Sequence, residues 1–380
     1  MNSSPQNIGC HITLGEIATY INGYAFKPSD YSSKEGDSII RIQDLTGNSY
    51  ETNKFSGSLP EKYRVNNGDI LISWSASLGV YEWTKGPAWL NQHIFKVVFD
   101  KKPINKSFFI HQARHIIDNS GNLAHGATMR HLTKKVFDAL PFYYPNPQEQ
   151  QQIAAHLDEL SAIIDSCQTA NRKLDYLVKS RFIEMFGDSS HWNELSMEHI
   201  GDKRAKLGEM CDVLNGYAFD SKLFNSESKG MPLIRIRDIK RGATSTYTTE
   251  DYSNQYLINN GDLLIGMDGE FNVARWKAKS ALLNQRVCRI RPQSLNLTDA
   301  YLEHLLPKIL KSIEARTSFV TVKHLSSKTL KAIEIPLPPL ALQQEFAAFV
   351  AQVDKLRFAT QQQIDKLEML KKSLMQEYFG

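Results

Sequence analysis

The chain has 380 residues, 42% of them hydrophobic and 23% charged, with a formal net charge of +4 at pH 7. This length predicts two or more domains with their own cores, and no apolar run is long enough to span a membrane. With no signal sequence recognisable either, we expect a cytoplasmic protein with no membrane partner. The slight basic excess permits a nucleic-acid partner without requiring one.

Short strands and turns are predicted over about the first 140 residues. Strands are expected at residues 39–42, 70–72 and 94–99, with a turn at 66–69. Helical spacing then appears at 108–118, and Thr133 is expected to cap a further short helix. This mixture of strands and helices predicts an α+β domain.

Two proline-rich segments, residues 141–147 and 336–339, each precede about forty residues without glycine or proline. The first of these stretches has a heptad seam of Ile153, Leu157, Leu160, Ile164, Cys167 and Leu174, with Asn171 as a polar member. The second has Phe346, Val350, Val353, Ile364 and Leu367 at matching positions, interrupted by Arg357 and Thr360. Both stretches therefore predict long helices, each roughly 60 Å at about 1.5 Å per residue.

Nearly every motif occurs twice, at a spacing of about 193 residues. Asn22-Gly23-Tyr24-Ala25-Phe26 returns at 215–219, and Asn66-Asn67-Gly68-Asp69-Ile70-Leu71-Ile72 returns, with leucine for Ile70, at 259–265. Leu90-Asn91-Gln92 returns at 283–285, and His131-Leu132 returns at 324–325. A repeat this long indicates whole domains rather than the units of a solenoid.

The duplication predicts two similar bodies related by a pseudo-twofold axis. If the two seams pack together, the second helix must run antiparallel to the first and finish near the first domain; alternatively, each helix folds back on its own domain. The expected fold is α+β, with two tandem domains at 1–146 and 188–339. The helices at 147–187 and 340–380 would form a long antiparallel two-helix coiled coil between them.

Signatures of catalysis are missing from the sequence. There is no G-x-G for a dinucleotide, no H-E-x-x-H and no G-x-S-x-G. Residues 121–128 have Walker-like glycine spacing, but Ala127 stands where the phosphate-binding lysine is needed. The four cysteines form no C-x-x-C pair, which argues against a zinc site or a disulfide framework. We therefore expect no catalytic residues and no bound metal, and favour a recognition protein.

In their order and duplication, these motifs resemble the DNA-specificity (S) subunits of type I restriction-modification systems. The matching motifs are N-G-Y-A-F, R-I-x-D (residues 41–44 and 235–238), N-G-D-[IL]-L-I, L-N-Q and H-L-[ST], followed by the proline segment at 336–339 and the glutamine-rich start at 149–154. The resemblance covers essentially the whole chain. The first proline segment departs locally from the usual form.

The resemblance implies that each domain is a target recognition domain that reads one half of a bipartite, asymmetric site in double-stranded DNA. The helices would fix the distance between the halves. Two methyltransferase (M) subunits would dock on the chain, and restriction (R) subunits would join them in a full system. The chain itself would bind no cofactor; S-adenosylmethionine, ATP and Mg would belong to the partner subunits.

Residues identical in both repeats cannot explain why two domains read different bases. Candidate DNA contacts are therefore polar residues that differ between aligned segments of the two repeats. Gln43 aligns with Arg237, Ser73 and Ser75 align with a segment ending in Asp268, His93 aligns with Arg286, and Arg130 aligns with Lys323. Arginine suits guanine, glutamine suits adenine, and aspartate suits cytosine. Lys134, Lys135 and Lys328 lie near expected helix starts, which suits phosphate contacts. An ordinary solvated role is the alternative for each of these residues.

Two other classes of function stay open from the sequence. A coiled-coil scaffold with no DNA specificity would show no salt-dependent DNA affinity in the presence of a methyltransferase. An enzyme with an unrecognised site would methylate or cleave DNA alone. Within the DNA-binding class, a complex that only methylates DNA is the alternative to a full restriction system.

Overall fold

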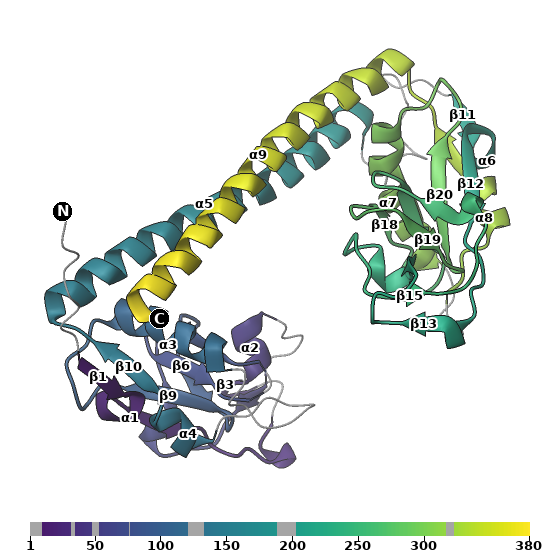
Figure 1. The fold of residues 1–380 in the computed structure, drawn as a ribbon. Coiled ribbons are helices and arrows are strands. Elements are labelled where there is room, and N and C mark those ends of the chain that lie inside the picture. The colour runs from purple at the N-terminus through teal and green to yellow at the C-terminus, as the bar shows by residue number, and fades with distance from the viewer. Residues whose placement is uncertain are drawn as a thin grey trace, which may run out of the picture. The chain divides into compact units, whose positions relative to one another are not determined.

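The computed structural model describes residues 10–31, 35–47, 53–75, 77–120, 133–187, 203–316 and 323–380. The chain divides into two compact units (Figure 1). Unit 1 comprises residues 1–168 and 362–380, and unit 2 comprises residues 169–361. Each unit therefore contains one repeat and parts of both long helices.

The first repeat is built from short strands, with longer helices towards its end. Its elements are β1 (Cys10–Thr13), α1 (Leu14–Ile17), β2 (Thr19–Asn22), η1 (Pro28–Asp30), β3 (Asp37–Ile40), α2 (Ile42–Thr46), β4 (Lys54–Phe55), η2 (Glu61–Tyr63), β5 (Arg64–Val65), β6 (Ile70–Ser73), β7 (Gly79–Glu82), β8 (Ala88–Leu90), β9 (Ile94–Val98), α3 (Lys106–Asn119), α4 (Lys134–Asp138), β10 (Pro141–Tyr144) and the long α5 (Pro147–Phe186).

The second repeat has nearly the same order of elements, with one additional short strand at residues 224–225 and a 3₁₀ helix in place of α2. They are β11 (Arg204–Lys206), α6 (Leu207–Met210), β12 (Cys211–Asn215), η5 (Ser221–Leu223), β13 (Phe224–Asn225), β14 (Met231–Ile234), η6 (Ile236–Asp238), β15 (Tyr247–Thr248), η7 (Asn254–Tyr256), β16 (Leu257–Ile258), β17 (Leu263–Gly266), β18 (Val273–Arg275), β19 (Ala281–Leu283), β20 (Val287–Pro292), α7 (Asp299–Arg316), α8 (Ser327–Ala332), β21 (Glu334–Pro336) and the long α9 (Leu340–Phe379).

The sheets of the two units have equivalent topologies. The order β2-β9-β6-β7 in unit 1 matches β12-β20-β17-β18 in unit 2, and both sheets are antiparallel. The order β4-β3-β8-β5 matches β15-β14-β19-β16, with β3–β8 and β14–β19 parallel. Each proline-rich segment pairs with the start of its repeat, as β1–β10 and β11–β21. The α+β fold expected from the duplication is confirmed.

The predicted strands at 70–72 and 94–99 and the helix at 108–118 appear as β6, β9 and α3. The prediction at 39–42 is wrong in its second half, since β3 ends at Ile40 and a helix begins at Ile42. The carboxylate of Asp44 accepts a hydrogen bond from the Arg41 amide at 2.7 Å, which caps the helix and turns the chain. The same device recurs between Arg235 and Asp238. Thr133 and Ser326 cap α4 and α8, as the sequence predicts for Thr133.

The long helices α5 and α9 pack antiparallel within each unit. In unit 1, the amine of Lys371 donates to the hydroxyl of Ser161 at 2.7 Å, and His156 meets the Tyr378 hydroxyl at 3.2 Å. In unit 2, Arg181 pairs with Glu345 at 2.8 Å. The seam is buried at Ile153, Leu157, Ile164, Phe346, Val350, Val353 and Ile364. The predicted coiled-coil packing is confirmed, and the fold-back alternative is excluded.

Arg357, a polar residue within the apolar seam, forms an ion pair with a residue of the other long helix. Arg357 of α9 pairs with Asp175 of α5 at 2.7 Å and with Asp354 of its own helix at 2.8 Å. A lone arginine at a seam position would lose solvation without compensation, whereas a paired one fixes the alignment of the two helices. This polar position in the seam therefore helps to fix the register of α5 against α9.

Each domain core is completed by the end of the helix that begins in the other repeat. Phe182 and Phe186, near the end of α5, are both 1% exposed within the core of unit 2. The end of α9 packs on the core of unit 1, where the rings of Phe379 and Phe108 lie 5.6 Å apart. The closing Phe-Gly of each repeat is thus part of the opposite domain.

The four cysteines are free. Cys211 and Cys288 are buried, and burial raises the pKa of each thiol to about 12. Both therefore stay protonated at neutral pH and pack as small apolar side chains. None of the helices that the structure describes is both long and apolar enough to cross a membrane.

Candidate nucleic-acid interface

The motifs common to both repeats hold each domain together. In N-G-Y-A-F, the amide of Tyr24 donates to the Leu90 carbonyl at 2.8 Å, and its carbonyl accepts from Gln92 at 2.8 Å. Tyr217 makes the same two bonds in the second repeat, at 2.9 and 2.7 Å. A side chain on Gly216 would collide with the Asn284 carbonyl, so glycine is required there. These motifs serve the fold.

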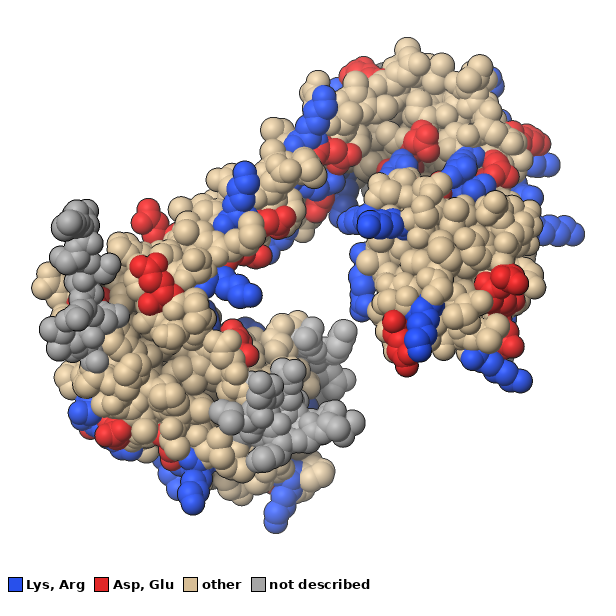
Figure 2. All heavy atoms as spheres, in the orientation of Figure 1, with Lys and Arg blue, Asp and Glu red and all other residues tan. Residues whose placement is uncertain are grey.

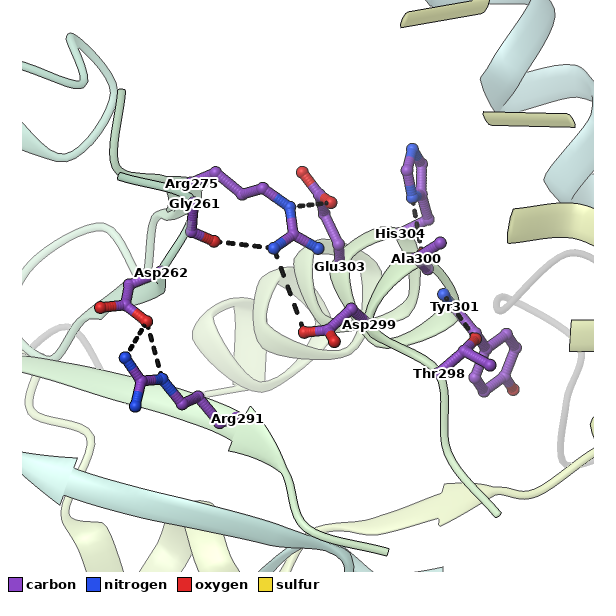
Figure 3. Close-up of polar contacts among 10 residues, drawn as sticks. All are labelled: Gly261, Asp262, Arg275, Arg291, Thr298, Asp299, Ala300, Tyr301, Glu303 and His304. Atoms are coloured by element: carbon purple, nitrogen blue, oxygen red, sulfur yellow. Dashed lines mark hydrogen bonds and ion pairs between the residues drawn. The ribbon is translucent and has the colours of Figure 1, made fainter. Parts of the chain in front are cut away.

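The N-G-D turns have an equally structural role. The Asp262 carboxylate accepts from the Asn259 amide at 2.8 Å. It also pairs with Arg291 of β20 at 2.6 Å, an ion pair that Figure 3 shows. Figure 3 also shows Arg275 of β18 bonded to the Gly261 carbonyl at 2.8 Å and to Glu303 of α7 at 2.6 Å. These contacts tie the turn, the sheet and α7 into one rigid support.

On this support, one backbone position is left-handed in both repeats. Among the residues described, the non-glycine residues with positive φ are His93 (80°), Arg286 (72°) and Ser228 (60°). His93 and Arg286 are equivalent, each directly following Leu-Asn-Gln, and both are exposed. A left-handed conformation costs a side-chain-bearing residue roughly 1–2 kcal/mol, and such strain often marks functional sites. The fold fixes this position, whereas the side chain on it differs between the repeats.

Arg286 lines an open hollow of about 500 Å³ in unit 2. The walls come from η6, from the loop between β17 and β18, and from the turn between β19 and β20. The lining residues are Arg235, Ile236, Arg237, Lys240, Glu270, Asn272, Asn284, Gln285 and Arg286. Four cationic side chains and three amides against a single carboxylate give the hollow a positive, hydrogen-bonding surface. Such a surface suits phosphate and base edges.

Internal contacts set which of these charges are free to act. Lys240 pairs with Glu270 at 2.6 Å, and this hydrogen bond lowers the pKa of Glu270. Arg235 is half-buried against Thr246, and burial together with the neighbouring Arg237 lowers its pKa. Arg237 is exposed at the mouth of the hollow. Arg237 and Arg286 are therefore the exposed arginines of the hollow, and Arg286 also pairs with Asp268 at 2.9 Å.

In unit 1, the equivalent surface is built differently. The ring of His93 lies 5.2 Å from that of Trp74, whose indole N–H donates to Asn22 at 3.2 Å. Gln43 is half-buried on α2, at the position equivalent to the exposed Arg237 of unit 2. Ser73 is 1% exposed and donates to the Ser77 carbonyl, and Ser75 is 7% exposed. Their burial removes both serines from the surface that DNA could contact.

The remaining candidates divide by exposure. Lys134, Lys135 and Lys328 are exposed in the first turns of α4 and α8, and Lys134 also pairs with Asp138 at 2.6 Å. The side chain of Lys323 is only 16% exposed, with Glu314 at 3.6 Å. Arg130 lies outside the residues that the structure describes. The exposed lysines keep the placement expected of phosphate contacts.

Besides Asn284 and Gln285 of the shared L-N-Q motif, four polar lining residues were missed from the sequence: Arg235, Lys240, Glu270 and Asn272. Lys240 aligns with Thr46 of the first repeat, so the same comparison of repeats could have found it. Arg235 is matched by Arg41, so a comparison that looks for differences between the repeats does not single it out. Asn272 lies in a loop where the repeats do not align clearly, and no sequence signal marks it.

The face drawn in Figure 2 shows lysine and arginine alternating with aspartate and glutamate along the long helices. This mixture favours a solvated surface and short-range ion pairs over a continuous basic track. We therefore place the DNA-binding candidates on the domains.

Comparison with known proteins identifies the family. The model of the type I restriction modification DNA specificity domain matches twice, at residues 11–176 and 202–369. The EcoBI specificity subunit of Escherichia coli is 43% identical over 174 residues, 45% of this chain and 37% of that protein. The MjaIX specificity subunit of Methanocaldococcus jannaschii is 22% identical over 332 residues, 81% of this chain and 76% of that protein. The matched region thus spans little more than a third of the EcoBI relative.

Solved structures share the fold. The S subunit of a type I system from M. genitalium aligns with a TM-score of 0.54 and 14% identity, over 100% of this chain and 98% of that one. A chain from a structure of the type I R-M system aligns with a TM-score of 0.53 and 16% identity, over 98% and 97%. With both repeats matched by one family model, the chain belongs to the family of type I restriction-modification DNA specificity proteins.

Proposed function

We propose that this chain reads a bipartite, asymmetric site in double-stranded DNA and directs methyltransferase subunits to it. The family supplies the role in DNA sequence specificity. The observation that carries the proposal is the left-handed position occupied by His93 in one repeat and Arg286 in the other. A common backbone with different exposed side chains is what two related domains need in order to read different half-sites.

The chemistry of these side chains suits the edges of base pairs. Arg237 and Arg286 can each present two parallel N–H donors to the O6 and N7 atoms of guanine, a contact worth about 1–3 kcal/mol of discrimination. Gln43 and His93 in the first repeat offer both donors and acceptors, as adenine recognition requires. The two half-sites are therefore expected to differ in sequence.

The exposed lysines complete the interface. Lys134, Lys135 and Lys328 are exposed in the first turns of short helices, where their amines can reach phosphate oxygens. Such contacts position the duplex without reading it, and they make affinity fall with salt. We assign these lysines to the DNA backbone.

The long helices provide a surface for the partner subunits. Tyr176 and Leu177 follow Asp175 on α5, and Leu356 and Phe358 flank Arg357 on α9, so all four lie near the level of the Arg357–Asp175 pair. Leu356 and Phe358 are two residues apart and therefore lie on different sides of α9. Tyr176, Leu177, Leu356 and Phe358 are 68%, 48%, 59% and 66% exposed. Exposed apolar clusters on a soluble protein mark interaction sites. We assign the exposed rings of Tyr176 and Phe358, which we call the Tyr176–Phe358 patch, to a methyltransferase subunit.

In this proposal the chain acts in the cytoplasm and has no catalytic residue of its own. Two methyltransferase subunits carry S-adenosylmethionine and the chemistry, and restriction subunits, where a system has them, carry ATP and Mg. Residues 1–146 and 188–339 act as the two target recognition domains, and residues 147–187 and 340–380 act as the spacer.

The first test targets Arg237. We expect Arg237→Ala, in cells that carry the matching methyltransferase, to relax the methylated motif at one position of one half-site, because one guanine contact is lost. Discrimination at that position should fall roughly tenfold, which corresponds to about 1.4 kcal/mol. Single-molecule methylome sequencing reads this directly.

Gln43→Ala is the matched control, since it should alter only the other half-site. A continuous palindrome in the wild-type methylome would contradict the two-domain reading. Equal loss of methylation at both half-sites in Arg237→Ala would point to misfolding instead.

The second test targets the Tyr176–Phe358 patch. We expect Phe358→Ser to weaken binding of the methyltransferase subunit roughly tenfold or more, because an aromatic contact of about 2 kcal/mol is removed from the interface. Co-purification and titration with the purified subunit measure this. Leu295→Ser is the control, since Leu295 is 92% exposed and lies outside the long helices. Equal binding by both variants would exclude this patch as the docking site.

A further inference from the structure

The acidic candidate Asp268 lies directly beside Arg286, and the two are held together by the backbone. Asp268 follows the end of β17, and Arg286 immediately precedes β20 in the same sheet. The amide of Met267 donates to the Arg286 carbonyl at 2.8 Å. The equivalent bond in unit 1, from Trp74 to His93, is 3.2 Å long. The neighbourhood of these two positions is therefore a property of the fold.

Both oxygens of the Asp268 carboxylate are occupied. Oδ2 accepts from the Nη1 atom of Arg286 at 2.9 Å, and Oδ1 meets the Nδ1 atom of His324 at 2.5 Å. The Asp268 side chain is 18% exposed, whereas those of Arg286 and His324 are 53% and 50% exposed. The acid thus lies beneath two donors that face the solvent. Both of its oxygens are engaged by Arg286 and His324, which leaves the acid poorly placed to accept from a cytosine.

This arrangement restricts Arg286 without using up its donors. An exposed arginine loses about 2 kcal/mol of rotamer entropy when it is fixed on a ligand, and a carboxylate that holds it beforehand reduces this cost. A guanidinium has five N–H donors, so one bond to Asp268 leaves enough for a bidentate contact with guanine. The left-handed backbone at Arg286 removes further freedom at the base of the side chain.

We propose that Asp268 is a positioning residue, which holds Arg286 in the orientation that reads a guanine in the half-site of the second domain. This inference rests on the proposed function and deepens it. His324 fixes the second oxygen of the carboxylate, so that Asp268 cannot rotate away from Arg286. The base contact that the sequence suggested for Asp268 is thereby reassigned to Arg286.

In the first repeat, the equivalent residue His93 is held by different neighbours. Ser75 stands at the position of Asp268 and is 7% exposed, so no carboxylate is available there. The ring of Trp74 lies beside His93 instead, at 5.2 Å. An acid suits a cationic arginine, and an aromatic face suits an imidazole. Each support matches the side chain that it holds.

The test compares Asp268→Asn, Arg286→Ala and the double variant in the complete complex with the methyltransferase subunits. The readouts are the methylome and the ratio of methylation rates on cognate DNA and on DNA changed at a single base. We expect Arg286→Ala to lower this ratio at one position at least tenfold, and Asp268→Asn to lower it at the same position by a smaller factor. The double variant should be no worse than Arg286→Ala, because a positioning residue has no effect once its partner is gone.

Asp212→Asn is the matched control. Asp212 pairs with Arg289 at 3.0 Å on the same sheet, away from the left-handed turn, and its loss should leave the motif unchanged. If Asp268→Asn changes a different base, or if its effect adds to that of Arg286→Ala, Asp268 reads DNA itself and the inference is overturned. A uniform fall in methylation with an unchanged motif would also overturn it, because it would show a purely structural role.

The outcomes separate this inference from the function on which it rests. A wild-type methylome without a bipartite motif would remove both. A bipartite wild-type motif that Arg286→Ala leaves intact would remove the role of Asp268 and Arg286 alone.

Discussion

Gly216→Ala is expected to lower the free energy of unfolding of the second domain by about 3 kcal/mol or more. The added methyl group would collide with the backbone carbonyl of Asn284, and neither strand can retreat without breaking the Tyr217 hydrogen bonds. Urea unfolding followed by circular dichroism measures the loss. Methylation by the complex should fall with it, because an unfolded domain reads no half-site.

Gly261→Ala is the control for a glycine that is needed only for its backbone angle. Its φ is +91°, and no atom lies within 4 Å of the added methyl group. We expect a cost of roughly 1 kcal/mol from the left-handed conformation. If Gly216→Ala is no more destabilising than Gly261→Ala, the close approach of the two motifs is not what requires glycine.

Phe182→Ala is expected to cost the second unit about 3–5 kcal/mol, the usual range for a fully buried phenylalanine. The ring is 1% exposed and lies 5.7 Å from Tyr301, 5.4 Å from Phe346 and 5.0 Å from Phe186. Its loss would leave a cavity where α5, α7 and α9 meet. Thermal and urea unfolding measure the effect.

Ile183→Ala provides the comparison, since Ile183 is the next residue of α5 and is 42% exposed. It should cost less than about 1 kcal/mol, because the helix is kept and little apolar surface leaves a buried site. Similar losses for the two variants would mean that α5 stabilises the unit through its backbone and not through this aromatic cluster.

The sequence was most informative where a pattern repeats over many residues. The heptad seam predicted both long helices and their antiparallel packing, because a periodic apolar stripe has few ways to be buried. The duplicated motifs predicted two equivalent α+β domains for the same reason. The break after Ile40 was missed because Ile39 and Ile42 are both good strand residues, and the outcome depends on the cap that Asp44 supplies.

The candidate site was only partly accessible from the sequence. Comparing the repeats found Arg237, His93 and Arg286, since they differ on a common frame. It could not show that His93 and Arg286 are left-handed, because no glycine or asparagine marks the position. Nor could it separate Ser73, which is buried, from Arg286, which is exposed, since burial depends on how the strand ends pack. The pairing of Asp268 with Arg286 is a tertiary contact that no spacing reveals.

The exchange of helix ends has a consequence for biosynthesis. Unit 1 needs residues 362–380, which the ribosome makes only after all of unit 2. Until then, the nascent first domain lacks the α9 residues, Phe379 among them, that pack on its core. Unit 2 contains no residue beyond 361. All of its residues are therefore synthesised before those of unit 1 are complete, although its repeat is translated second. The first domain therefore keeps apolar surface uncovered until translation ends. This surface makes it the part of the chain that is more prone to aggregate during translation and more dependent on a chaperone.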